Sequence, residues 1–96
     1  MIPKTRTPTH PGEVLLEEFL EELGIPQLRF AETLGITVQR VNEIVKGKRG
    51  ITPETAWLFS AALGTTPEFW MNLQVQYDLA RARPAAKKVP RLRAAG

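Results

Sequence analysis

Side chains that can hydrogen-bond to the edges of nucleic-acid bases gather in one short stretch of this sequence. Gln39 and Arg40 are adjacent, and Asn42 follows two positions later. In the major groove of DNA, glutamine pairs with adenine and arginine pairs with guanine. The stretch continues into three cations suited to phosphate groups, Lys46, Lys48 and Arg49. These residue types indicate recognition of bases combined with contact to the phosphate backbone.

Catalysis and metal binding lack the side chains that they require. The chain has no cysteine and a single histidine, His10, so neither a thiolate metal site nor a histidine-based triad is expected. The glutamate-rich stretch from Glu13 to Glu22 has no nucleophile or second catalytic partner beside it. We therefore expect a protein that is not an enzyme and takes no cofactor, with His10 as a capping or surface residue.

The length and hydropathy of the chain favour one small globular domain. Its 96 residues, 43% of them hydrophobic, suffice for a single helical core. No apolar run approaches the roughly 20 residues that cross a bilayer. The first ten residues also lack the apolar stretch of a secretory signal. These features predict a cytoplasmic protein without membrane contact.

The net charge of +3 conceals an uneven distribution. Residues 13–22 hold five carboxylates and no cation, whereas residues 29–49 hold five cations and two carboxylates. Residues 81–93 add six cations and no acid. Basic regions suit a polyanion such as DNA, because each neutralised phosphate releases a counterion. The basic end of the chain is equally compatible with a tail that only interacts with water.

Helical periodicity and capping residues predict an all-α fold in which five helices position these side chains. Thr52-Pro53-Glu54 and Thr66-Pro67-Glu68 are typical helix starts, and Gly24, Gly35 and Gly47 are typical stops. The predicted helices cover residues 11–23, about 26–34, 38 to about 46, 53–63 and 67 to about 83. The apolar faces expected to form the core include Leu23 on the first predicted helix and Leu28 on the second.

The second and third of these helices form a predicted helix-turn-helix. Ala31 is small enough for two helices to cross closely, and Gly35 tolerates the positive φ that the link requires. Ile36, Val41 and Ile44 then pack the third helix against the core. That packing directs five residues to the open side, Val38, Gln39, Asn42, Glu43 and Lys46.

On these residues, the helix-turn-helix resembles that of the Cro and phage-repressor (XRE) family. Four motifs resemble more narrowly the HigA/VapI-type antitoxins, namely His10–Glu13, Arg40–Ile44, Gly47–Thr52 and Pro67–Gln74. The resemblance spans roughly residues 9–80 and implies a five-helix, lambda-repressor-like DNA-binding domain. It also implies a homodimer on a palindromic operator near its own gene, and neutralisation of a small RelE-like, ribosome-dependent ribonuclease toxin.

The resemblance further implies roles for individual residues. Thr37, Val38, Gln39 and Arg40 would face bases, with Asn42 on the same open side. Phosphates would be held by Gln27, Lys46, Lys48 and Arg49. Glu43 would either accept a hydrogen bond from cytosine or remain solvated.

The chain is expected to divide into a flexible arm (1–10), a helix-turn-helix and dimerisation domain (11–83) and a basic, disordered tail (84–96). The expected dimer contacts lie on the fifth helix and comprise Phe69, Trp70, Leu73 and Tyr77, since aromatic residues are enriched where subunits meet. The acidic face from Glu17 to Glu22 would either be solvated or meet a basic toxin.

Two alternatives to a DNA-binding antitoxin remain. One is a free-standing transcriptional regulator with the same helix-turn-helix and no toxin. The other is a protein-interaction module that no longer binds DNA. The first would protect an operator without a toxin partner, and the second would protect none even at low salt.

Overall fold

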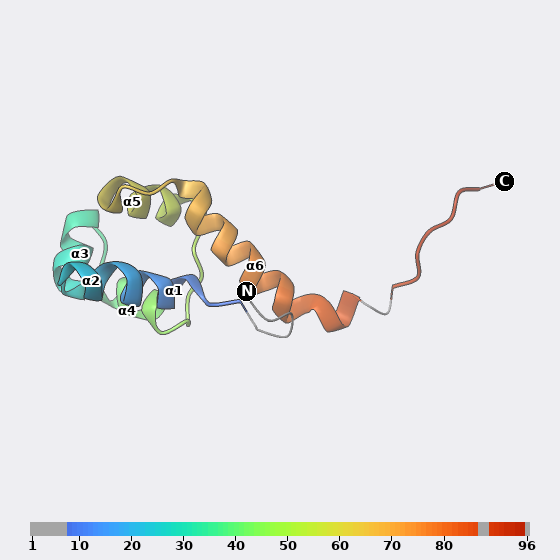
Figure 1. The fold of residues 1–96 in the computed structure, drawn as a ribbon, viewed down its shortest axis with the longest axis horizontal. Helices are drawn as coiled ribbons and strands as arrows, with labels where there is room; N and C mark the ends of the chain where they lie inside the picture. Colours follow the sequence, from blue (N-terminus) through green and yellow to red (C-terminus); the bar gives the residue numbers. More distant parts are fainter. Residues whose placement is uncertain (1–7, 87–88, 96) are drawn as a thin grey trace.

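The computed structural model describes residues 8–86 and 89–95, and within these the secondary structure is entirely helical (Figure 1). Its elements are α1 (Pro11–Val14), the π-helical η1 (Leu15–Leu20), α2 (Glu21–Leu23), α3 (Gln27–Leu34), α4 (Val38–Val45), α5 (Pro53–Leu63) and α6 (Pro67–Ala86). The first three follow one another without a break and form one helical segment, residues 11–23. The predicted all-α, five-helix fold is therefore confirmed.

Polar caps explain where these helices begin. Nδ1 of His10 accepts a hydrogen bond of 2.9 Å from the backbone N–H of Gly12, which confirms the capping role expected for this histidine. Threonine hydroxyl groups one residue before α4, α5 and α6 accept in the same way from a backbone N–H three residues on, in Thr37, Thr52 and Thr66. α3 follows Pro26 and has no side-chain cap. Each cap satisfies a backbone donor that the helix itself leaves without a partner.

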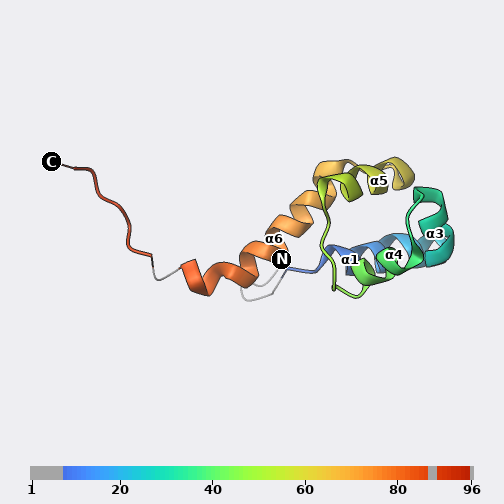
Figure 2. The ribbon, with the colours of Figure 1, turned by 180° about the vertical axis from the view of Figure 1, so that it is seen from behind.

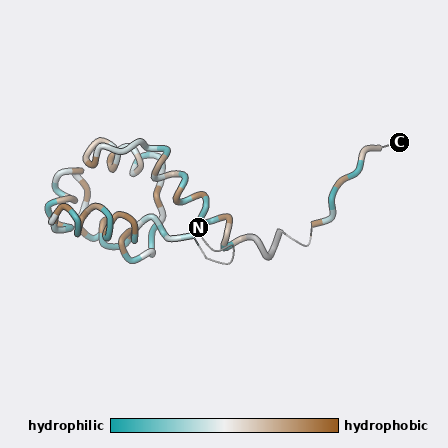
Figure 3. The backbone as a smooth tube through the Cα atoms, in the orientation of Figure 1, coloured by the Kyte–Doolittle hydropathy of each residue, from teal (hydrophilic) through white to brown (hydrophobic). Residues whose placement is uncertain are grey.

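The core lies where all the helical segments meet. Figure 3 shows hydrophobic and hydrophilic stretches alternating along the helices, as expected for elements with one buried side. Phe59 of α5 is central, with its ring centroid 5.3 Å from that of Phe30 and 5.1 Å from that of Trp70. The indole N–H of Trp70 donates to the hydroxyl of Thr65 at 2.7 Å, so the one polar atom of this buried ring is satisfied.

Two leucines expected in the core lie outside it. Leu23 is 59% exposed and Leu28 is 56% exposed. Leu23 is the last residue of its helical segment, just before the turn at Gly24. In α3 the buried side is centred on Phe30 and Ala31, and a rotation of about 100° per residue carries Leu28 well away from it.

The last helix is longer than predicted. α6 continues to Ala86, three residues beyond the expected end near Arg83 and through Pro84. Proline lacks the N–H that would donate to the carbonyl of Ala80, so the helix loses one backbone hydrogen bond there, and it ends two residues later at Ala86. Figures 1 and 2 both show the second half of α6 projecting away from the other helices.

The remaining parts of the predicted domain division stay predictions. Most of the arm, residues 1–7, and residues 87, 88 and 96 of the tail lie outside the described residues. Residues 89–95 are exposed and form neither helix nor strand. Within the described ranges, no helix is both long and apolar enough to cross a membrane.

Candidate nucleic-acid interface

The turn between α3 and α4 has the geometry that the sequence predicted. Gly35 adopts φ 74°, and the N–H of Ile36 reaches back to the carbonyl oxygen of Ala31 at 3.1 Å. Ala31, Val41 and Ile44 are buried, which confirms their predicted packing roles. The two helices are therefore held at a fixed angle, with one side of α4 facing away from the core.

The open side of α4 carries the side chains that were predicted there. Val38 and Gln39 are exposed at its first turn, and Lys46 is exposed at its end. Asn42 and Glu43 are half-buried between them. Thr37 is exposed as well, although its hydroxyl already accepts the capping hydrogen bond from the N–H of Arg40. This surface combines amide groups, an apolar methyl pair and cations, which suits base edges and phosphates.

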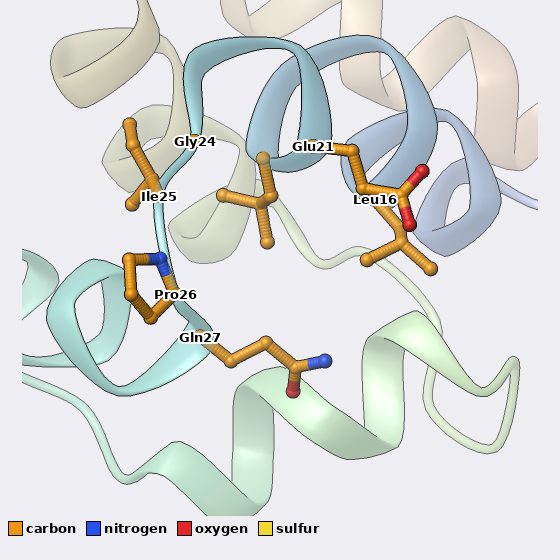
Figure 4. A pocket seen from close by; sticks show the side chains of 7 residues that line it. Leu16, Glu21, Gly24, Ile25, Pro26 and Gln27 are labelled. Atoms are coloured by element: carbon orange, nitrogen blue, oxygen red, sulfur yellow. The ribbon is translucent and has the colours of Figure 1, made fainter.

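A side-chain hydrogen bond joins the two helices across this surface. Nδ2 of Asn42 donates to Oε1 of Gln27 at 3.2 Å. Figure 4 shows the Gln27 side chain extending from the start of α3 toward α4. Because Oε1 is engaged, the amide N–H groups of Gln27 point elsewhere and can donate to a phosphate. Gln27 thus braces a residue of α4 in the free chain.

Arg40 contacts side chains of the neighbouring helix. Its guanidinium Nη2 lies 3.2 Å from Oε1 of Glu54 and 3.1 Å from the hydroxyl of Thr55, both in the first turn of α5. The Arg40 side chain is only 27% exposed. In the free chain, the charge of Arg40 therefore joins α4 to α5, and its contact with bases stays a prediction. The sequence alone did not reveal these partners, which lie 14 and 15 residues away.

The cations at and after the end of α4 differ in their ion pairing. Nε and Nη2 of Arg49 lie 3.1 and 3.0 Å from Oε1 of Glu43, so this arginine neutralises the carboxylate of α4. Lys46 and Lys48 are exposed beside it. The Arg49–Glu43 pair removes an acidic charge that would otherwise repel phosphates.

Figure 4 also shows a hollow beside the start of α3, lined by Leu16, Leu20, Glu21, Gly24, Ile25, Pro26 and Gln27. Glu21 is its only ionisable side chain, so it offers no pair of groups for acid–base chemistry. Among the described residues, no three histidine or acidic side chains come together as a metal site. The exposed glutamates of residues 11–23 lie along one helical segment, and two of them, Glu13 and Glu17, line a hollow together with Lys46 at the end of α4.

The predicted dimer residues are not all available to a partner. Trp70 is 0% exposed and packs inside its own chain, so the prediction that it contacts a second copy is wrong. Phe69 is exposed, Leu73 is half-buried, and Tyr77 packs its ring edge-to-face against His10 at 4.8 Å.

Further exposed apolar side chains lie on α5 and α6, and the sequence predicted Trp57 only in general terms as an aromatic of the core or the dimer. Trp57 of α5 is 65% exposed, beside a hollow whose apolar lining includes Pro53, Pro67 and Met71. Val75 and Leu79 of α6 are exposed as well. The core of α5 is formed at positions 55, 56, 59 and 60, so Trp57 falls on the other side of the helix. That periodicity was the sequence signal for its exposure.

Comparison with known proteins gives consistent matches. The helix-turn-helix family model matches residues 16–70. Virulence-associated protein I of Dichelobacter nodosus is 41% identical over 73 residues, which cover 76% of this chain and 68% of that protein.

Two similar solved structures were determined with DNA. Antitoxin GraA in complex with its operator is 37% identical with a TM-score of 0.84, over 98% of this chain and 100% of that one. Pseudomonas aeruginosa antitoxin HigA with the higBA promoter is 42% identical with a TM-score of 0.79, over 84% of this chain and 88% of that one.

Proposed function

Because this chain belongs to the helix-turn-helix family that includes the HigA-type antitoxins, we propose that it is a sequence-specific DNA-binding autorepressor and the antitoxin of a toxin–antitoxin pair. The observation that carries the proposal is the open side of α4, where Val38, Gln39 and Asn42 stand on a helix anchored by its buried side. Relatives with the same fold and 37–42% identity were solved on operator or promoter DNA.

The position of each residue on this surface indicates its role in DNA binding. Gln39 and Asn42 read bases by hydrogen bonds, Val38 contacts a thymine methyl, and Thr37 adds a hydroxyl at the edge of the groove. Lys46 and Lys48 contact phosphates. Gln27 holds Asn42 and a phosphate together, while Arg49 serves mainly to neutralise Glu43.

The chain acts as a homodimer in this proposal, because one recognition helix covers only half of a palindromic operator. The exposed apolar surface of Trp57, Val75 and Leu79 is the interface that we favour, with Phe69 at its margin. Trp57 stands beside a hollow on its own surface. In a two-fold pair, each Trp57 can therefore enter the hollow of the other copy, as an isologous contact requires.

The toxin in this proposal is a small ribonuclease whose basic surface meets the exposed glutamates of residues 13–22. Glu13 and Glu17 line one hollow together with Lys46, so the proposed toxin and DNA surfaces adjoin there. Glu18, Glu21 and Glu22 lie on the same helical segment outside that lining. Both partners of such a pair act in the cytoplasm, where the operon is transcribed and translated.

Co-expression with the small reading frame beside its gene tests the antitoxin role. The tagged chain is expected to retain that neighbour in a stoichiometric complex and to relieve its growth toxicity. A variant with Glu17, Glu18 and Glu21 changed to glutamine is the matched control, and it should release the toxin while still binding operator DNA.

The outcomes separate the alternatives. An operator footprint without a complex or toxicity would leave a free-standing regulator. A complex without any footprint, even at low salt, would leave a protein-interaction module, and replacement of Gln39 would then not alter binding to its partner.

A further inference from the structure

A buried glutamine of α6 holds the loop that follows α4. Gln74 is 9% exposed, and its Oε1 accepts a hydrogen bond of 2.7 Å from the backbone N–H of Ile51. Its Nε2 donates to Oδ1 of Asp78 at 2.9 Å, one turn further along α6. Ile51 lies between α4 and α5, outside any helix. Its buried N–H therefore obtains from Gln74 the partner that secondary structure does not supply.

The loop also packs directly against this amide. A Cβ added to Gly50 would lie 3.0 Å from Oε1 and 3.1 Å from Nε2 of Gln74. These distances are shorter than ordinary van der Waals contact, so Gly50 is explained by close approach of the loop backbone. The position of the Gln74 amide thus determines where the backbone runs at residues 50 and 51.

At its other end the same loop is attached to α4. The N–H groups of Lys48 and Arg49 lie 2.8 and 3.2 Å from the carbonyl oxygen of Glu43. The Arg49 side chain pairs with the Glu43 carboxylate as well. Lys48 and Arg49 are exposed between this attachment and the one at Ile51. A displacement at Ile51 would therefore move both cations relative to the base-reading face of α4.

We propose that Gln74 is a positioning residue for DNA binding, which rests on the proposed function. It sets the loop of residues 47–52 so that Lys48 reaches a phosphate while α4 lies in the groove. Gln74 is buried and acts only through this loop. Asp78 directs the amide, because a carboxylate only accepts hydrogen bonds and so holds the NH₂ group on its own side, leaving Oε1 for Ile51.

Replacement of Gln74 by methionine tests the link to Ile51. Gln74→Met keeps the length of the side chain but removes the acceptor. We expect weaker operator binding and a shallower dependence of log K on log salt, by about 0.9 for each phosphate that is no longer neutralised. Gln76→Met is the matched control, since Gln76 is exposed on the same helix, and it should keep both affinity and slope. Thermal unfolding monitored by circular dichroism verifies that each variant is folded at the assay temperature.

Asp78→Ala gives a second test at an exposed position that the fold should tolerate. Removing a negative charge would by itself strengthen DNA binding. Without the partner that orients Gln74, binding should instead weaken and the salt slope should fall. Glu22→Ala removes the same charge far from the loop, and there the electrostatic effect alone should remain. We therefore expect Asp78→Ala to weaken operator binding and Glu22→Ala to strengthen it.

The results distinguish the inference from the proposed function. If the unmodified chain binds no operator, the proposed function itself fails. If it binds, but folded Gln74→Met matches the unmodified chain and Asp78→Ala matches Glu22→Ala, only the positioning role is overturned. Lys48→Ala should cost less affinity in the Gln74→Met background than in the unmodified chain, and simple additivity would also contradict the role.

Discussion

At the scale of single residues, Arg40 shows how the partners of a side chain decide its role. An arginine at the start of a recognition helix can read guanine. Here its guanidinium instead contacts Glu54 and Thr55, which hold α4 against α5. The pair with Glu54 is largely solvated, so its contribution to stability is small, on the order of 0.5 kcal/mol. The main effect of this ion pair is to orient α4.

Arg40→Ala should therefore weaken binding to every operator sequence by a similar factor. Fluorescence anisotropy with a set of single-base-substituted operators measures this. Glu54→Gln removes the charged partner of Arg40 but also a negative charge that repels DNA, so it should weaken binding less than Arg40→Ala does. A loss of preference confined to one base pair would instead mean that Arg40 leaves Glu54 and reads a base in the complex.

Substitutions of Gln39 and Lys48 should affect operator binding in different ways. Gln39→Ala is expected to relax the preference at one base-pair position, by about 1–3 kcal/mol of discrimination. Lys48→Ala should weaken all sequences alike and reduce the salt slope by about 0.9 per protomer. The same operator set, titrated at several salt concentrations, separates the two effects. Identical profiles for both variants would contradict the assignment of α4 as the reading element.

His10 makes stability depend on pH. Burial lowers the pKa of His10 below its usual value near 6.5, and the smaller effects include Asp78, which raises it, and Arg81, which lowers it further. The cap also requires an unprotonated Nδ1, since this atom accepts from Gly12. The unfolded chain thus binds this proton more readily than the folded chain. The stabilisation is complete above about pH 7.5 and is lost as the pH falls through 6.5 and below.

Thermal unfolding at pH 8 and pH 5.5 measures this dependence, and Tm should be lower at pH 5.5. His10→Asn is the control, because asparagine caps a helix without titrating in this range. Its Tm should change less between the two pH values. An equal shift in both proteins would assign the effect to other groups.

At the scale of the elements, the sequence predicted the helices well because their ends are set locally. Threonine caps, prolines in the first turn and the glycines at positions 24 and 35 act within a few residues of the ends that they define. The roles of Ala31 and Gly35 were predictable for the same reason. The end of α6 was less accurate, because the proline at position 84 does not stop a helix that is already finishing.

Contacts between elements could not be predicted from such local patterns. Arg40 meets Glu54 fourteen residues away, and Gln74 meets Ile51 across twenty-three. The burial of Trp70 also depends on packing, and only the assembled helices show that its ring closes the core.

The two tryptophans should respond in opposite ways to truncation. Trp70→Ala removes a fully buried ring and should destabilise the fold by about 3–5 kcal/mol. Trp57→Ala should leave the fold of the protomer intact but shift the protein from dimer to monomer. Chemical denaturation and analytical ultracentrifugation measure the two properties. A Trp57→Ala variant that sediments like the parent would place the dimer interface elsewhere.

At the scale of the whole molecule, opposite charges gather on different elements. Exposed glutamates follow the first helical segment, whereas exposed lysines lie at the end of α4 and just after it. The two groups meet at one hollow, which Glu13, Glu17 and Lys46 line together. In the proposed function, a basic protein would meet the glutamates beyond this hollow, at Glu18, Glu21 and Glu22, while DNA meets the cations.

Footprinting of the DNA upstream of the chain's own operon tests operator recognition most directly. Protection of two half-sites, with centres about one helical turn apart or a multiple of that, is the expected result. Protection should weaken steeply between about 50 and 200 mM salt and should disappear from its base-specific positions in Gln39→Ala. Absence of protection at the lowest salt, with the protein folded and dimeric, would contradict the assignment of this chain as a DNA-binding repressor.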